Sequence, residues 1–287
     1  MDSHKITTIG RPLNPGYFTN KLIIIITVLT FIIHTILTIV TLFNSAHEET
    51  NYTNLITGFR AGLLVFLLWA ISRELDPDKE WGAFVTVSLA LVFMVFFEIP
   101  SILPFAWFLL ILRMTNHSSG MPAGIMDSFL VATIGTILAY YVSGIYGILT
   151  AMTFISDSQL NDPAKYHFPI GALMLIVSAG ICFRQGGTIF DQTLESMFFV
   201  LSGIILFLPA IIWPGKLESV GDRTNEPLDP ARIKMGKVMG ILVFLGVLTM
   251  PAEASLALVP FIFCIFAGTG AYRIVSGILL HTSIKKG

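Results

Sequence analysis

Charged residues are scarce in this sequence. Asp, Glu, Lys and Arg make up 12% of its 287 residues, which is about half the proportion found in soluble domains. The net charge is −1 and no basic tract occurs, so nucleic acid is excluded as an expected partner. The two cysteines, Cys182 and Cys264, each lie inside an apolar run, and they predict neither a disulfide framework nor a metal site.

Motifs for several kinds of catalysis are also missing. The six histidines include no pair at His-x-x-His or His-x-x-x-His spacing. The chain has no His-Glu-x-x-His motif, no phosphate-binding loop with its lysine and no Gly-x-Ser-x-Gly. The longest hydrophilic segment, 214–237, is too short for a domain that hydrolyses ATP. We therefore expect no metal centre, and the sequence assigns no catalytic residue.

Long apolar runs dominate the chain instead. Hydrophobic residues make up 54% of it, and the mean hydropathy is +0.80. Several runs, among them 22–43, 82–112 and 128–155, exceed the roughly 18 apolar residues that suggest a transmembrane helix. Run 22–43 is too long for the apolar core of a cleavable signal peptide, so we expect it to remain as the first helix. The sequence predicts an all-α, multi-pass integral membrane protein in a lipid bilayer.

The number of spans depends on run 82–112. This run contains Glu98 and Pro100, and as a single helix it would be roughly 46 Å long. One long kinked helix gives eight spans, whereas a turn at Glu98–Pro100 gives nine. Lys and Arg accumulate in cytoplasmic loops, and this rule favours eight spans because nine would divide the basic residues almost evenly between the faces. Eight spans leave three of the 17 basic residues outside, namely Arg60, Arg113 and Arg184.

The eight-span threading places both termini in the cytoplasm. It divides the chain into a cytoplasmic segment 1–21, a single transmembrane domain 22–272 and a cytoplasmic tail 273–287. The inner membrane of a bacterium is the expected location, since the sequence shows no eukaryotic sorting signal.

The densest group of charges is the stretch 73–80, Arg-Glu-Leu-Asp-Pro-Asp-Lys-Glu, which lies between two apolar runs. Its Asp-Pro-x-Lys/Arg pattern begins at Asp76 and recurs at Asp162 and Asp229, each time shortly before a span. In the eight-span threading all three copies lie on the cytoplasmic face. Asp accepts hydrogen bonds from the free N–H groups of a starting helix, and Pro is favoured at the first helical position. The pattern therefore predicts helix starts.

The same stretch allows a second interpretation. The carboxylates of Asp76, Asp78 and Glu74 are hard oxygen ligands of the kind that bind Mg²⁺, which can bridge to a phosphate. In length, and in having an acidic stretch after the second helix, the chain resembles membrane prenyltransferases of the UbiA type, which have nine helices. In a nine-span count, segment 184–195 supplies their second acidic stretch, although the N-x-x-x-D-x-x-x-D spacing is absent at both places. The resemblance implies a transferase acting on an isoprenoid diphosphate, with Mg²⁺ as a cofactor in that case only.

Two ionisable residues are expected within the membrane. Glu98 lies near the middle of run 82–112 beside Pro100, and His34 lies near the middle of the first span. Ionisable groups at bilayer depth are costly and suggest function by default, and this pair would suit a proton-coupled or ion-coupled site. The alternatives are a structural hydrogen bond for His34 and, with nine spans, an exposed turn for Glu98.

Three functions remain open at this point. The leading hypothesis is a small-solute or ion transporter or channel that uses Glu98 and His34. The alternative is a membrane-embedded transferase acting on a lipid or isoprenoid substrate at the cytoplasmic interface, and the third is a structural or assembly subunit.

Overall fold

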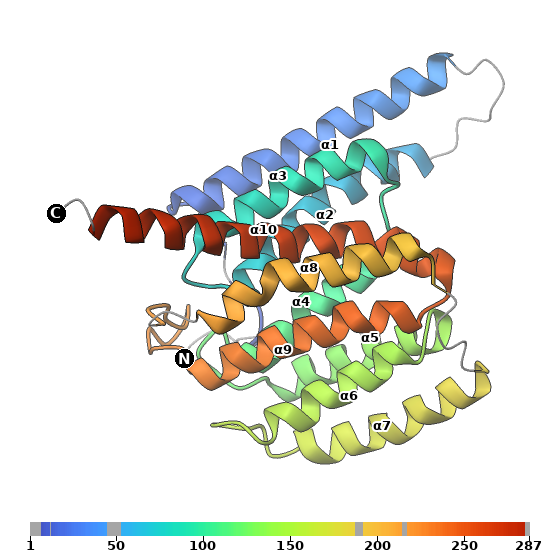
Figure 1. The fold of residues 1–287 in the computed structure, drawn as a ribbon. Coiled ribbons are helices and arrows are strands. Elements are labelled where there is room, and N and C mark those ends of the chain that lie inside the picture. The colour runs from blue at the N-terminus through green and yellow to red at the C-terminus, as the bar shows by residue number, and fades with distance from the viewer. Residues whose placement is uncertain (1–6, 12, 45–52, 187–191, 214–216, 285–287) are drawn as a thin grey trace, which may run out of the picture.

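The computed structural model describes residues 7–11, 13–44, 53–186, 192–213 and 217–284, which contain helices and their connecting segments. The helices lie roughly along one direction and form a bundle (Figure 1). The α-helices are α1 (Phe18–Asn44), α2 (Thr53–Leu75), α3 (Glu80–Phe96), α4 (Leu103–Asn116), α5 (Ile125–Tyr141), α6 (Ile145–Asp157), α7 (His167–Arg184), α8 (Leu194–Ile212), α9 (Pro230–Gly246) and α10 (Ala252–Ile284). A short 3-10 helix, η1 (Val247–Thr249), separates the last two.

Five helices are long and apolar enough to cross a membrane, namely α1, α2, α7, α8 and α10. The helices α3 to α6 are apolar but shorter. Large apolar side chains stay exposed on the outer helices, for example Ile33 and Leu37 on α1 and Ile176 on α7. A soluble monomer rarely exposes extended apolar surfaces, whereas helices in a bilayer present them to lipid. The fold is therefore that of a helical, multi-pass membrane protein.

Run 82–112 forms two helices, so the prediction of one long kinked helix is wrong. Arg60, in the first half of α2, donates a hydrogen bond to the carbonyl oxygen of Ile99 at 2.7 Å. Asn116, at the end of α4, donates to the carbonyl oxygen of Glu74, in the last turn of α2, at 2.8 Å. From the end of α2 the chain therefore turns back along α2 as α3, reverses at residues 97–102 and returns as α4, which ends beside the last turn of α2.

Run 128–155 also folds back, as α5 and α6. Both turns carry local signals, because Pro104 stands in the first turn of α4 and Gly144 immediately precedes α6. A Cβ atom at Gly144 would come within 3.1 Å of the backbone nitrogen of Cys182. Gln185 fastens this second turn by accepting a hydrogen bond from the Gly144 N–H at 2.9 Å. The two hairpins give ten α-helices in the described residues, where eight spans were expected.

One end of the bundle, on the left in Figure 1, carries most of the charge, and we call it the basic end. It comprises the connecting segments 7–11, 13–17, 76–79, 117–124, 158–166 and 217–229 together with the adjoining helix turns. In the part of the chain that the structure describes, Arg60 and Arg184 are the only basic residues toward the opposite end. All three Asp-Pro-x-Lys/Arg copies lie at the basic end, which confirms that they share one face.

Small and aromatic residues allow the helices to pack closely. Gly62 of α2 faces α1, where a Cβ atom would come within 2.8 Å of the Thr27 carbonyl oxygen. Between α3, α8 and α10, Phe93, Phe199 and Phe263 pack with ring centroids 5.2 to 6.0 Å apart. These contacts hold α1 against α2, and α3 against α8 and α10, and each of these helices has one of its ends at the basic end.

Candidate functional site at the basic end

Glu74 is a buried carboxylate in the last turn of α2. Its side chain is 1% exposed, and a charge so deeply buried requires partners. Arg11 Nη1 lies 3.2 Å and Arg113 Nε 3.3 Å from Glu74 Oε1. Ser118 Oγ donates to Oε1 at 3.2 Å, and Asn116 Nδ2 donates to Oε2 at 3.3 Å. Four donors from three segments of the chain thus fix the position of Glu74.

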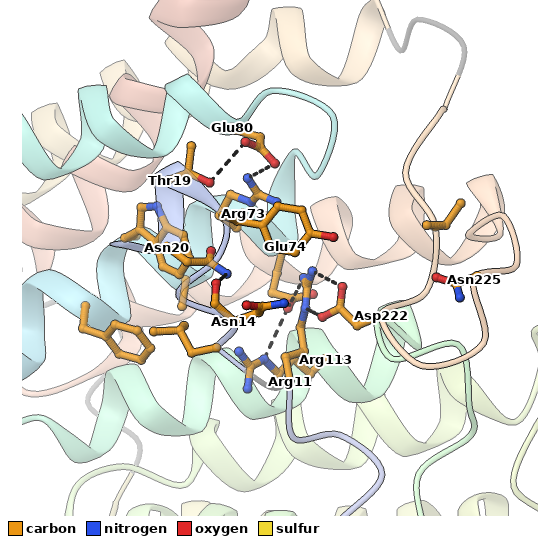
Figure 2. A pocket seen from close by; sticks show the side chains of 16 residues that line it. Arg11, Asn14, Thr19, Asn20, Arg73, Glu74, Glu80, Arg113, Asp222 and Asn225 are labelled. Carbon is orange, nitrogen blue, oxygen red and sulfur yellow. Dashed lines mark hydrogen bonds and ion pairs between the residues drawn. The ribbon is translucent and has the colours of Figure 1, made fainter. Parts of the chain in front are cut away.

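Arg11 joins the N-terminal segment to two carboxylates (Figure 2). While Nη1 contacts Glu74, Nη2 lies 2.9 Å from Asp222 Oδ1 and Nε contacts Asp222 Oδ2. Burial by itself lowers the pKa of the Arg11 guanidinium, but Glu74 and Asp222 outweigh this effect and raise it above its ordinary value. Arg11 therefore keeps its positive charge, and the two-atom contact with Asp222 is the fork geometry that arginine also forms with phosphate.

A cavity of about 480 Å³ opens beside these groups. Its lining combines apolar and aromatic side chains, contributed by Leu13, Tyr17, Phe66, Trp69 and Ala70, with charged and amide side chains. The polar lining consists of Arg11, Asn14, Thr19, Asn20, Arg73, Glu74, Glu80, Arg113, Asp222 and Asn225. We call this cavity the basic-end pocket. Ligand pockets typically have this size and this mixture of apolar walls with a few placed polar groups.

Arg73 and Trp69 form a further part of the pocket wall. Arg73 Nη1 lies 2.7 Å from Glu80 Oε1, and its guanidinium carbon is 5.9 Å from the centre of the Trp69 ring. The Trp69 side chain is buried, and its indole nitrogen has no hydrogen-bond partner within the described part of the chain. An unpaired buried donor costs free energy.

A second buried cluster is centred on Asp157, at the end of α6. Its carboxylate accepts hydrogen bonds from His117 Nε2 at 2.9 Å, His167 Nδ1 at 2.5 Å and Arg232 Nη1 at 2.7 Å. The side chains of Asp157 and His167 are fully buried, and that of Arg232 is 3% exposed. Arg232 also donates to the Thr115 carbonyl oxygen at 3.0 Å. The cluster joins α4, α6, α7 and α9 through one carboxylate.

Part of this cluster follows the order of a serine–histidine–aspartate triad. Ser128 Oγ lies 2.8 Å from His167 Nε2, and His167 Nδ1 contacts Asp157. The Ser128 hydroxyl also lies 3.0 Å from the Gly124 carbonyl oxygen and has only one hydrogen to donate. Ser128 is fully buried and does not line the basic-end pocket. The geometry therefore indicates a structural hydrogen-bond chain between α5, α7 and α6.

The three acidic candidates from the charged stretch separate in the structure. Glu74 lines the basic-end pocket. Asp76 is buried and forms a two-atom ion pair with Arg273 of α10, at 2.6 and 2.7 Å. Asp78 accepts hydrogen bonds from the backbone nitrogens of Ser219 and Glu218 at 2.9 and 3.2 Å. Across the described residues no group of three or more His, Cys, Asp or Glu is placed to hold a metal, and the three carboxylates of this stretch are held by different partners.

The helix-start interpretation holds for one of the three copies. Asp229 caps α9 by accepting a hydrogen bond from the Ala231 N–H at 2.8 Å, with Pro230 as the first helical residue. At Asp76 the interpretation is wrong, because α3 begins only at Glu80 and Asp76 turns to Arg273. It is also wrong at Asp162, where the backbone is left-handed (φ 53°) and α7 begins five residues later.

Glu98 and His34 lie in different surroundings. Glu98 is exposed in the turn between α3 and α4, at the end opposite the basic end, so its predicted position in the middle of a helix is wrong. His34 is half-buried within α1, and its backbone carbonyl accepts a hydrogen bond from the Thr38 hydroxyl at 2.8 Å. Glu98 and His34 therefore do not both lie within helices, as a proton-coupled or ion-coupled pair inside the membrane would require.

The role of the N-terminal segment was not predicted from the sequence. Asp127, in the first turn of α5, accepts hydrogen bonds from the Thr8 backbone N–H at 2.6 Å and the Thr7 hydroxyl at 2.5 Å. Arg223 donates to the carbonyl oxygen of Gly10 at 3.0 Å. These contacts lay residues 7–11 across the basic end and carry Arg11 to Glu74. An Asp in the first turn of a helix was a visible signal, but the sequence does not indicate its partner.

Comparisons with known proteins leave the chain without an assigned family: no family model, no curated protein and no solved structure matches it.

Proposed function

We propose that this membrane protein binds an amphipathic ligand with an anionic head group, of the lipid or isoprenoid class, in the basic-end pocket. The observation that carries the proposal is the pocket itself, where Arg11 and Arg113, whose side chains are 20% and 16% exposed, stand beside an apolar wall. An anionic head group would contact Arg11 and Arg113, and its hydrocarbon part would pack against Phe66 and Leu13.

The distribution of charge supports a location for the pocket at the membrane surface. We propose that the ten helices each cross the bilayer, with the basic end on the cytoplasmic side. Of the described basic residues, only Arg60 and Arg184 then lie outside, which agrees better with the positive-inside rule than the eight-span threading does. The pocket then lies at the level of the lipid head groups, where an amphiphile is concentrated. The inner membrane of a bacterium stays a prediction.

The pocket favours the lipid or isoprenoid alternative over the other two functions predicted from the sequence. Transport through a carboxylate at bilayer depth rested on Glu98, which lies in an exposed turn. A transfer reaction on the bound amphiphile is compatible with the pocket, but a Mg²⁺-bridged diphosphate is not supported, because Asp76 and Asp78 are held by Arg273 and by backbone N–H groups. Binding through guanidinium groups requires no metal.

The proposal is tested by ligand-dependent thermal unfolding of the purified protein in a neutral detergent. Dodecyl phosphate at about 100 times its dissociation constant should stabilise the protein by about 2.7 kcal/mol, whereas dodecanol, with the same chain and no charge, should have a much smaller effect. The variant Arg11→Gln should lose most of the stabilisation, because it removes a guanidinium group that contacts the head group. The buried Glu74 carboxylate keeps a counter-ion in this variant, since Arg113 remains beside it.

The matched control is Arg223→Gln, which removes an arginine that contacts the same N-terminal segment but does not line the pocket. It should keep the response to dodecyl phosphate. Equal stabilisation by dodecyl phosphate and dodecanol, or an unchanged response in Arg11→Gln, would refute the proposed function.

A further inference from the structure

We infer that Asp222 competes with the ligand's anionic head group for Arg11, because its carboxylate occupies the Nε and Nη2 atoms of the guanidinium group that the head group would bind. The inference rests on the proposed function and concerns the regulation of the same pocket. It makes Asp222 a specificity-determining residue of the pocket as well as a contact between the loop 217–229 and the N-terminal segment.

The first step is the geometry of the contact. Asp222 presents both carboxylate oxygens to Nε and Nη2 of Arg11, which is the arrangement that a carboxylate or phosphate of a ligand would adopt on the same guanidinium. Asp222 lines the pocket together with Arg11. A head group bound there would therefore require the position that the Asp222 carboxylate occupies.

The second step is that the two carboxylates on Arg11 differ in how firmly they are held. Glu74 is 1% exposed and has three further donors in Arg113, Ser118 and Asn116. The side chain of Asp222 is 27% exposed, and among the described residues its carboxylate is held by Arg11 alone. Exposed ion pairs are weak because water replaces them at little cost. Asp222 is therefore the exchangeable partner.

The third step is charge balance. The pocket lining contains three guanidinium groups, of Arg11, Arg73 and Arg113, and three carboxylates, of Glu74, Glu80 and Asp222. An added phosphate would leave uncompensated negative charge in a partly buried site, which is unfavourable. Release of the Asp222 carboxylate into water removes one negative charge and restores the match.

The loop can release this side chain without leaving its place. Its backbone is attached on both sides of Asp222, because Ser219 binds Asp78 through its backbone N–H at 2.9 Å and the Arg223 N–H donates to the Ser119 carbonyl oxygen at 3.1 Å. A rotation of the Asp222 side chain therefore suffices, and no refolding of 217–229 is needed.

The test compares the dissociation constants of wild type, Asp222→Asn and Asp222→Ser for dodecyl phosphate, measured by the same thermal-unfolding titration. Both variants should bind about two- to fivefold more tightly, which is the range expected when a weak exposed ion pair no longer competes. Glu226→Gln removes an exposed carboxylate from the same loop outside the pocket and should bind as wild type does. In the Arg11→Gln background, Asp222→Asn should have no effect.

The outcomes separate the two proposals. Wild-type binding with unchanged or weaker binding by both Asp222 variants would overturn the competitor role and leave the proposed function standing. No binding by wild type and by either Asp222 variant would overturn both. Inorganic phosphate is the second probe. If its binding depends on Asp222 in the same way, the competitor role is supported for a free anion. If only the binding of dodecyl phosphate depends on Asp222, the competitor role is supported for a lipid head group.

Discussion

The substitution Asp157→Asn removes the charge on which the buried cluster between α4, α6, α7 and α9 is centred. It keeps the shape of the side chain but replaces one carboxylate oxygen with an NH2 group that faces donors. Arg232, whose side chain is 3% exposed, would keep only uncharged partners, namely the remaining amide oxygen and backbone carbonyls such as that of Thr115. The substitution therefore leaves a buried cation without its counter-ion.

The expected loss follows from this geometry. Removing one partner of a buried ion pair typically costs about 3–5 kcal/mol, because the remaining charge stays out of water. Arg232→Gln should cost less than Asp157→Asn, since His117 and His167 remain in hydrogen-bond contact with the carboxylate. The double variant should be more stable than the sum of the single losses predicts, because neither charge is then left alone.

The assay is reversible unfolding in mixed detergent micelles, followed by circular dichroism, with free energies of unfolding for all four proteins. Asp162→Asn is the control, because Asp162 is an exposed neighbour with a left-handed backbone that Asn tolerates. It should stay within about 0.5 kcal/mol of wild type. A loss below about 1 kcal/mol for Asp157→Asn, or strictly additive single losses, would refute the account of the cluster.

Three further predictions concern the threading and the packing. In a cysteine-free background, single cysteines replacing Ser101 and Glu226 should be labelled by an impermeant maleimide from opposite sides of the membrane, whereas absence of labelling at position 101 from either side would favour one unbroken helix. Gly270→Ala should lower the free energy of unfolding by about 1–3 kcal/mol, since its Cβ would overlap the Leu206 carbonyl group; a neutral effect in the same unfolding assay would contradict this. Asp127→Ala should speed limited proteolysis within residues 7–17, because it removes the hydrogen bonds of that segment to α5; an unchanged cleavage rate would show that the contacts of Arg11 and Arg223 are sufficient to hold the segment.

Helix ends illustrate what could be predicted. Run 22–43 was expected to form the first helix and α1 runs from Phe18 to Asn44, because an apolar run bounded by polar residues needs no tertiary information. By contrast, α9 begins at Pro230 although a hydrophilic loop was expected as far as 237. Its first turns contain Arg232 and Lys237, which are buried only because Asp157 and the Ala210 carbonyl oxygen receive their hydrogen bonds. Such partners cannot be read from the local composition.

The sequence by itself determined the class of the protein. Long apolar runs are suited to a lipid environment, and their length and composition are properties of single segments. Only the tertiary structure decided that the runs 82–112 and 128–155 turn back, and only it assembled the basic-end pocket. Arg11 and Asp222 are 211 residues apart, and Arg113 is 39 from Glu74. Contacts at such distances along the chain depend on which helices pack together, and a pattern within one helix does not contain that information.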